Sequence, residues 1–335
     1  MSKRKLTRRQ SWRIAKIQAE RSARASKREA STVDQLQEGD LGPEQHGVII
    51  THFGTQVLVE AGGVSKRCYF RTNLGSLVAG DEVVWRDGNP YGVVVAVLPR
   101  QSALMRPDPY GDLKTVAANI DRLAIVVAPY PEPQLNSIDR YLVAAEASDI
   151  PPVIVINKTD SIDEQSRPFF DTVEALYPSL GYQVLRVSTH TGEGLDALAV
   201  YLSQYTSAFV GQSGVGKSSL ANALLPGINL RVGALSERNT GSHTTTNARL
   251  FHFPQGGHLI DSPGIREFGL WHMSEEDVID AFVEFRPFLG RCKFRDCGHE
   301  HEPECALRDA LEEGKIQPSR MASYRQIISA TSTNK

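Results

Sequence analysis

The sequence predicts an α/β protein with three folded parts: an N-terminal OB-fold β-barrel, a mostly parallel sheet with helices on both faces, and a C-terminal helical domain. Three patterns support this prediction. Short β-branched runs separated by turn residues fill positions 47–104, strand and helix patterns alternate from about residue 120, and a helical, acidic stretch follows Gly269. The expected boundaries are 1–40 for a basic arm and linker, 41–110 for the barrel, 111–270 for the sheet, and 271–335 for the C-terminal domain with its helical tail.

Composition favours a soluble protein of a reduced compartment. Of 335 residues, 41% are hydrophobic and 23% are charged, which is ordinary for a chain with room for two or three domains. No apolar run approaches the roughly 18 residues of a membrane helix, and the start lacks an apolar secretory segment. Four cysteines in so long a chain do not suggest a disulfide scaffold. We therefore expect a cytoplasmic protein without a membrane partner, and nothing demands more than a monomer.

The first 30 residues form a basic arm. They carry eleven Lys or Arg and two Glu, a net charge of +9 in a chain whose total is −2, so the remainder carries −11. This asymmetry favours a polyanion partner, although a solvated tail or an Arg- and Ser-rich transit peptide has a similar composition. The charge clusters at 3–5 and 8–9 suit phosphate contacts better. Residues 32–45 are acidic, contain Gly and Pro, and are expected to be a linker.

Five short strands are expected in the barrel. They cover Val48–Ile50, Gln56–Val59, Arg67–Phe70, Glu82–Trp85 and Gly92–Val97. Such a set is typical of an OB-fold, and we expect this one to bind RNA. Phe53, Tyr69 and Phe70 can stack on bases, although such side chains more often belong to the core. Cys68 is expected to be buried.

Strands and helices alternate in the next part. Strands are expected at Leu123–Ala128, Pro152–Ile156, Val184–Val187, Ser207–Val210 and His258–Ile260, with helices over Ile138–Ala147, after Gly194 and over Leu220–Leu225. This alternation predicts the mostly parallel sheet covered by helices.

A phosphate-binding loop follows the fourth of these strands. It runs Gly211-Gln212-Ser213-Gly214-Val215-Gly216-Lys217-Ser218-Ser219 and matches G-x4-G-K-[ST] between a strand and a helix. Its glycines let backbone N–H groups turn toward phosphate oxygens, and the helix adds its positive end. Lys217 is expected to neutralise the β- and γ-phosphates and Ser218 to hold Mg²⁺. The loop does not select the base, because adenine nucleotides use it too.

A second motif selects the base. Asn157-Lys158-Thr159-Asp160 follows the second strand of this part and has the form NKxD. The Asp160 carboxylate can accept two hydrogen bonds from guanine N1–H and N2–H₂, a donor pair that adenine lacks. Asn157 would brace the phosphate loop, and the stem of Lys158 would pack against the base. The loop from Ser188 to Leu195 resembles the segment that completes a guanine pocket.

The order of these motifs is unusual, because the base-reading motif precedes the phosphate loop. In an ordinary GTPase domain the phosphate loop comes first, so this domain is expected to be circularly permuted. Asp261-Ser262-Pro263-Gly264 fits the pattern DxxG. Asp261 is expected to reach Mg²⁺ through water, and the Gly264 N–H to sense the γ-phosphate. In the loop at 241–247, which precedes the DxxG motif, Thr245 is the favoured Mg²⁺ ligand and Thr244 is the second choice.

Hydrolysis needs a group that orients the attacking water. In Ras-type enzymes a Gln follows DxxG, but here that residue is Ile265. His243 lies beside the threonine run, and a neutral imidazole can orient or activate water near pH 7. We expect His243 to be catalytic and intrinsic turnover to be slow until a partner orders the loop, although an ordinary loop histidine fits the same position.

A Cys/His cluster suggests a metal site. Cys292, Cys297, His299 and Cys305 form the pattern C-x4-C-x-H-x5-C within 14 residues. Three thiolates and one imidazole suit one closed, tetrahedral, structural Zn²⁺ without an open position for catalysis. A disulfide or reduced core cysteines are the alternatives, and His301 is a second candidate for the histidine ligand.

Barrel, permuted GTPase and Cys/His module, in that order, resemble the RsgA/YjeQ family of ribosome small subunit-dependent GTPases. The resemblance also rests on GQSGVGKSS at 211–219, HTTT at 243–246 and DSPGIREFG at 261–269. It implies a GTPase that uses Mg²⁺, binds the 30S subunit and its 16S rRNA near the decoding region, hydrolyses GTP there late in maturation, and is then released. Gly214 stands where potassium-activated relatives carry Asn, so no potassium site is expected.

Two rival functions stay open. An RNA-binding assembly factor with incidental hydrolysis predicts that His243→Ala still matures 30S normally. A metal-delivery GTPase predicts labile zinc that exchanges during turnover. The permuted order also places DxxG directly before the Cys/His module, so we expect the nucleotide state to influence that module.

Overall fold

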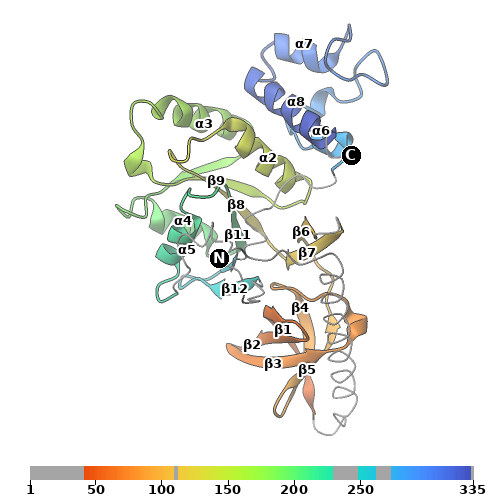
Figure 1. Ribbon diagram of the computed structural model, residues 1–335, viewed down its shortest axis with the longest axis vertical. Helices are drawn as coiled ribbons and strands as arrows, with labels where there is room; N and C mark the ends of the chain where they lie inside the picture. Colours follow the sequence, from red (N-terminus) through yellow and green to blue (C-terminus); the bar gives the residue numbers. More distant parts are fainter. Residues whose placement is uncertain (1–40, 109–111, 229–247, 262–272, 333–335) are drawn as a thin grey trace, which may run out of the picture. The chain divides into compact units, whose positions relative to one another are not determined.

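The computed structural model describes residues 41–108, 112–228, 248–261 and 273–332, whose elements are labelled in Figure 1. The chain divides into two compact units after Pro99. The first unit holds the expected barrel strands, and the second holds the nucleotide motifs and the Cys/His cluster. Within the described ranges, no helix is long and apolar enough to cross a membrane.

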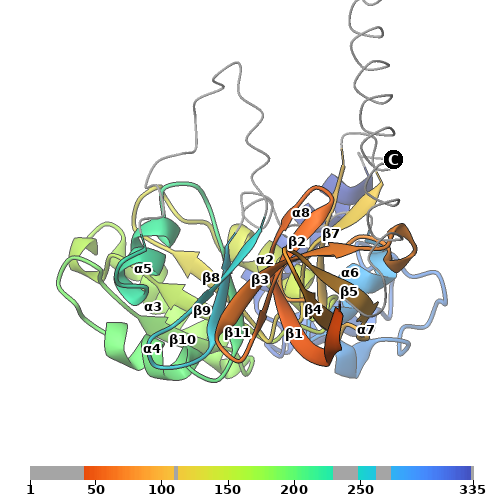
Figure 2. The ribbon, with the colours of Figure 1, turned by 90° about the horizontal axis from the view of Figure 1, so that it is seen from below.

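The first unit is a closed β-barrel. Its strands are β1 (Leu41–Phe53), β2 (Gln56–Ala61), β3 (Val64–Phe70), β4 (Glu82–Gly88) and β5 (Gly92–Val97), with a 3₁₀ turn at Thr72–Leu74. The order β1-β2-β3-β5-β4 closes because β1 also pairs with β4, and β3 runs parallel to β5 (Figure 2). Val57, Val59 and Cys68 are fully buried in the barrel core, where burial raises the pKa of the Cys68 thiol to about 12. The predicted OB-fold barrel is confirmed.

The predicted linker at 32–45 is wrong from Leu41 onward, because β1 begins there. This early part of β1 pairs with β4, and the Arg86 side chain donates to the carbonyl oxygens of Gly42 at 2.8 Å and Leu41 at 3.1 Å. The register shifts just after Leu41, where Pro43 lacks the N–H that a regular ladder needs. Gly and Pro therefore mark an irregular strand end in this segment.

The second unit contains a hairpin and a sheet. The hairpin is β6 (Ala103–Pro107) with β7 (Leu113–Ala118), and the sheet strands are β8 (Arg122–Val127), β9 (Pro152–Ile156), β10 (Gln183–Arg186), β11 (Thr206–Val210), β12 (Arg249–His252) and β13 (His258–Asp261). Their order is β10-β9-β8-β11-β13-β12, parallel from β10 to β13, with β12 antiparallel to β13. The mostly parallel sheet is confirmed. The hairpin and β12 were not expected, and the hairpin lies beyond the compact barrel unit.

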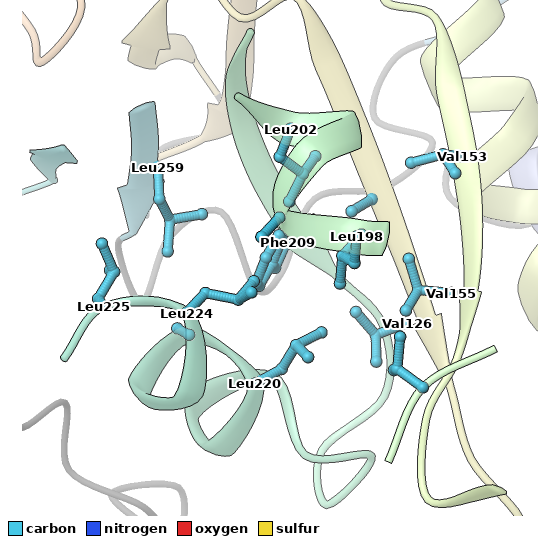
Figure 3. Packing of buried hydrophobic residues seen from close by; sticks show 14 of the residues in the cluster. Val126, Val153, Val155, Leu198, Leu202, Phe209, Leu220, Leu224, Leu225 and Leu259 are labelled. Atoms are coloured by element: carbon cyan, nitrogen blue, oxygen red, sulfur yellow. The ribbon is translucent and has the colours of Figure 1, made fainter. Parts of the chain in front are cut away.

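Helices cover both faces of this sheet. They are α2 (Leu135–Glu146), α3 (Arg167–Ser179), α4 (Leu195–Leu202) and α5 (Lys217–Leu224), with a 3₁₀ turn at Thr159–Ser161. Figure 1 shows α2 and α3 on one side of β8 and β9, and α4 and α5 on the other. On the α4–α5 side, the helices and strands share one apolar core (Figure 3), which includes Val126, Val155, Leu198, Leu202, Phe209, Leu220 and Leu224. Each fully buried side chain of this kind stabilises the fold by about 1.5–3 kcal/mol, so the strand ends that carry the motifs are firmly held.

The C-terminal part packs three helices around a second core. They are α6 (Glu275–Asp280), α7 (Ala306–Glu312) and α8 (Pro318–Ser332), with a 3₁₀ turn at Arg286–Phe288. Ser274 and Asp277 form a capping box that starts α6. The rings of Phe282, Phe285 and Tyr324 contact one another, with centroids 4.9–5.7 Å apart. The expected helical tail corresponds to α8, which packs in this core and against α2.

Candidate active site and metal centre

The phosphate loop joins β11 to α5, and two of its glycines are required by close approach. Gly211 has φ of 136°, and an added Cβ would collide with the carbonyl oxygen of Val126 on β8. Gly216 has φ of 96°, and a Cβ would lie 2.5 Å from Asn157 Nδ2. Both glycines therefore let the loop lie tightly against its neighbours. The loop ends at the first turn of α5, and the positive N-terminal end of this helix suits an anion.

The side chains of the phosphate loop contact the loop itself and α2. Lys217 is 8% exposed and donates from Nζ to the carbonyl oxygens of Gly211 at 2.6 Å and Gln212 at 2.7 Å. Gln212 donates from Nε2 to Ser137 Oγ on α2 at 3.1 Å. Val215 is buried. The remaining predicted members lie in the same loop and first helical turn: Ser213, Gly214, Gly216, Ser218 and Ser219.

Asn157 and Lys158 tie the base-reading motif to the phosphate loop. Asn157 is fully buried at the end of β9 and donates from Nδ2 to the Val215 carbonyl oxygen at 2.9 Å. Lys158, with φ of 58°, donates from Nζ to the carbonyl oxygens of Gly214 at 2.7 Å and Tyr130 at 3.1 Å. The fold thus brings together two motifs whose paired residues, Asn157 and Val215, are 58 positions apart.

Asp160 and Ser188 form a pair suited to reading a base. Ser188 is fully buried and donates from Oγ to Asp160 Oδ1 at 2.5 Å, while its Oγ accepts from the N–H groups of His190 and Thr191. The hydrogen bond from Ser188 is the main cause that lowers the pKa of Asp160, and Ser161 and His190 contribute. His190 Nδ1 lies 3.7 Å from Asp160 Oδ2. Asp160 is therefore an ionised acceptor at neutral pH, which suits a ligand with two adjacent donors.

Two contacts around this pocket were not expected from the sequence. Thr159 donates from Oγ1 to Glu193 Oε2 at 2.6 Å, which joins the base-reading motif to the loop after β10. Tyr130, between β8 and α2, donates from its hydroxyl to Asp163 Oδ2 at 2.9 Å. Glu193 lies in the loop already assigned to the pocket, so a signal for it existed. Tyr130 lies outside every motif.

The remaining predicted nucleotide residues are only partly placed. Asp261 is the last residue of β13, the strand next to β11, and is half-buried. His243, Thr244, Thr245 and Gly264 lie outside the described residues. Their predicted roles stay predictions.

The four predicted metal ligands come together at one end of α7. The ligand atoms of Cys292, Cys297, His299 and Cys305 all lie within 4.8 Å of one another. Cys292 Sγ is 3.9 Å from Cys305 Sγ, and His299 Nδ1 is 3.6 Å and 3.3 Å from these sulfurs. Zn–S bonds of about 2.3 Å in a tetrahedron would separate two sulfurs by about 3.8 Å, so the spacing fits a metal ion. His301 is exposed and outside this cluster, and the cysteines are free thiols.

The protonation of these groups also suits a metal ion. Burial lowers the pKa of His299, which keeps its imidazole neutral and able to act as a ligand. Burial and the neighbouring thiols raise the pKa of Cys297 to about 12. A divalent cation among the four side chains would counter this rise, because it favours the thiolate form. The donor set therefore fits a structural metal centre.

The barrel aromatics differ in exposure. Phe53 is 46% exposed, and the guanidinium of Arg67 lies 5.0 Å from its ring centroid. Tyr69 and Phe70 are half-buried, with Tyr69 edge-on to Tyr91 and Phe70 against the barrel core. Phe53 therefore presents the most accessible of the three rings for stacking.

Comparison with known proteins agrees with this geometry. Residues 97–271 match the family model described as RsgA GTPase. The chain belongs to the RsgA GTPase family. Proteins named "Small ribosomal subunit biogenesis GTPase RsgA" match it from end to end. The one from Azotobacter vinelandii is 59% identical over 337 residues, covering 98% of each chain, and the one from Pseudomonas fluorescens is 59% identical over 341 residues, covering 100% of this chain and 99% of the relative.

Solved structures related to the RsgA family confirm the fold. The crystal structure of YjeQ from Thermotoga maritima has a TM-score of 0.74 and 33% identity, covering 86% of this chain and 98% of that one. YloQ, described as a circularly permuted GTPase, has a TM-score of 0.70 and 26% identity, covering 88% and 96%. The permuted GTPase fold predicted from the motif order is therefore confirmed.

Proposed function

We propose that this chain is a GTP hydrolase that acts in small ribosomal subunit biogenesis. The observation that carries the proposal is the Ser188–Asp160 pair beside the phosphate loop, because it presents an ionised carboxylate to a base with two adjacent donors. Guanine has this donor pair and adenine does not. The names of the relatives add the process, small ribosomal subunit biogenesis.

The residues of the site divide the work of binding GTP. The phosphate-loop N–H groups donate hydrogen bonds to the phosphate oxygens, and Lys217 turns from its loop carbonyls toward the β- and γ-phosphates. Ser218 and Thr245 would hold Mg²⁺, with Asp261 as a further group on the side of this ion, and Mg²⁺ would neutralise charge that develops on the phosphates. The Gly264 N–H would sense the γ-phosphate.

Hydrolysis depends on His243, because Ile265 cannot orient water. We expect the imidazole of His243 to position the attacking water once a partner has bound. The 30S subunit is the proposed partner, with hydrolysis coupled to release. Slow turnover in its absence follows from this dependence.

Binding to 16S rRNA is assigned to the basic arm and the barrel. The arm supplies charge for phosphate contacts, and Phe53 with Arg67 offers a stacking platform. The metal is proposed to be one structural Zn²⁺, expected at one ion per chain by elemental analysis. The protein is proposed to act as a cytoplasmic monomer.

The test is GTP hydrolysis by the purified protein alone, with 30S subunits, and with 50S subunits. We expect strong stimulation by 30S only, because the proposed activating partner is the small subunit. Equal, slow turnover in all three mixtures would leave a GTP-binding protein with another partner.

A His243→Ala variant then separates catalysis from assembly. We expect it to bind GTP normally and to lose the 30S-stimulated rate by about 10²–10⁴-fold. His301→Ala is the matched control, because His301 is exposed and outside the metal cluster. If His243→Ala still matures 30S at the normal rate, hydrolysis is incidental. Zinc lost to a mild chelator during turnover would favour the metal-delivery alternative.

A further inference from the structure

The segment between β8 and α2 contacts both loops of the nucleotide site, although no motif includes it. Tyr130 lies in this segment and is 57% exposed. Its carbonyl oxygen accepts from Lys158 Nζ at 3.1 Å, and its hydroxyl donates to Asp163 Oδ2 at 2.9 Å. Lys158 precedes Asp160 and Asp163 follows it. Tyr130 therefore contacts the base-reading loop on both sides of Asp160.

The same segment touches the phosphate loop. Lys158 Nζ, bound to the Tyr130 carbonyl, also donates to the Gly214 carbonyl oxygen at 2.7 Å. A Cβ added at Gly214 would lie 3.4 Å from Pro131 Cδ, so the chain passes close to the phosphate loop at this point. Three segments that are separate in sequence meet at one ammonium group.

The Asp163 end of this contact is itself well fixed. Asp163 Oδ1 accepts from the N–H and the hydroxyl of Ser166 at 2.9 and 2.7 Å. These bonds and the one from Tyr130 lower the pKa of Asp163 to about 2, while the Asp163 carboxylate raises the pKa of the Tyr130 phenol. The pair is thus a neutral phenol donating to a carboxylate at neutral pH, a stronger hydrogen bond than a neutral pair makes.

We propose that Tyr130 is a positioning residue for the guanine nucleotide, acting through Lys158 and through the turn that carries Asp160. Lys158 adopts a left-handed backbone, which is unfavourable for a residue with a side chain and needs contacts that hold it. Its stem can support a base only while its ammonium stays anchored. The Tyr130 hydroxyl fixes the far end of the same turn at Asp163, so that Asp160 is presented at a constant angle.

Tyr130→Phe tests this inference, which rests on the proposed GTP site. The variant removes the hydroxyl and keeps the ring and the carbonyl oxygen. We expect the Kd for fluorescent GDP and the KM for GTP to rise about three- to tenfold. The kcat should stay within about twofold of the parent, because the lost support acts equally on the ground state and the transition state.

Tyr182→Phe is the matched control. The Tyr182 hydroxyl donates to a carboxylate oxygen of Glu146 at 3.1 Å, in the same unit but away from the nucleotide motifs. This variant should leave both Kd and KM unchanged. A rise equal to that of Tyr130→Phe would show a general loss of stability and overturn the inference.

A double-mutant cycle keeps the test specific to the proposed contact. In an Asp163→Ala background, Tyr130→Phe should have no further effect on GDP affinity, because its partner is already gone. Additive effects, or a Tyr130→Phe variant that binds GDP as tightly as the parent, would overturn the inference. Failure of the parent protein itself to bind GDP or GTP would instead overturn the proposed function.

Discussion

Asp160 is held as an ionised carboxylate, and this charge state determines which hydrogen-bond donors of a ligand it can bind. Ser188 occupies one carboxylate oxygen at 2.5 Å and lowers the pKa of Asp160, so the group only accepts hydrogen bonds at neutral pH. An Asp160→Asn side chain would both accept and donate. It should therefore lose about 100-fold in GDP affinity and gain affinity for xanthosine diphosphate, whose base has a carbonyl where guanine has an amine.

Competition of both nucleotides against one fluorescent probe measures this change in preference. Thr159→Ser is a suitable control, because it keeps the hydroxyl that donates to Glu193 and leaves the carboxylate of Asp160 untouched. An Asp160→Asn variant with the guanine preference of the parent would show that another group reads the base.

Single residues differ in how far the sequence could predict them. Asn157, Lys158 and Asp160 lie in a local four-residue pattern, so their place near the phosphate loop was foreseeable. Glu193 lies in a loop that was assigned to the pocket, but its contact with Thr159 was not predicted, and Tyr130 was not assigned. The partners Thr159 and Asp163 lie 34 and 33 positions away, and only the sheet order brings each pair together. A local sequence pattern does not show which distant residues will contact each other.

Helix α8 is joined to the sheet layer by a buried ion pair. Arg320 is fully buried and bonds both oxygens of Glu284 at 2.6 and 3.1 Å and Asp139 Oδ1 on α2 at 2.6 Å. Asp139 also accepts from Tyr177 on α3 at 2.7 Å. Burial alone would lower the pKa of Arg320, but the two carboxylates raise it above its ordinary value. One guanidinium group therefore connects α8 to α2 and Glu284, and Asp139 extends this network to α3.

Removing this guanidinium should be costly. Arg320→Ala leaves two buried carboxylates without a counter-charge, so we expect the free energy of unfolding to fall by about 3–5 kcal/mol. Combining Arg320→Met with Asp139→Asn and Glu284→Gln should recover much of that loss, because no buried charge remains. Urea unfolding of each variant measures both effects. Arg325→Ala, an exposed position on the same helix, should change stability by about 0.5 kcal/mol or less, and a loss equal to that of Arg320→Ala would contradict this account.

The same helix shows why some elements were predicted less fully than others. Strand β9 and most of β8 are continuous apolar runs, which identify buried parallel strands directly. Helix α8 has a polar sequence, because part of its buried face is Arg320 and Ser323, and burial of an ion pair cannot be inferred from polarity. The start of β1 was hidden by Pro43 for a related reason, since turn residues also occur at strand irregularities.

At the scale of the whole chain, α2 connects the phosphate loop to the C-terminal part. Ser137 accepts from Gln212 of the phosphate loop, and Asp139, two residues later, accepts from Arg320 on α8. In the permuted order the chain also runs from Asp261 at the end of β13 toward the metal ligands. The motif order predicted the second connection, whereas the first depends on packing between distant segments. Both link the metal module to elements that carry the nucleotide loops.

The charge of the chain yields a prediction that involves no part of the nucleotide site. Residues 1–30 carry a net charge of +9 against −11 for the remainder, and five of the positive charges are Lys3, Arg4, Lys5, Arg8 and Arg9. If these contact rRNA phosphates, their binding releases counterions. Replacing all five with Gln should then reduce the slope of log affinity for 30S against log salt by up to about four.

The affinities of the parent and the variant for 30S subunits at 50 and 200 mM salt give the slope for each protein. At 50 mM salt, we expect the parent to bind on the order of tenfold or more tightly than the variant. GTP hydrolysis without ribosomes should be unchanged, because the predicted nucleotide residues all lie between 157 and 264. An unchanged slope would identify the arm as a solvated tail and shift rRNA recognition to the folded units. A reduced slope with unchanged basal hydrolysis would mean that the arm contributes to the affinity for the 30S subunit, whereas GTP hydrolysis depends on the permuted domain alone.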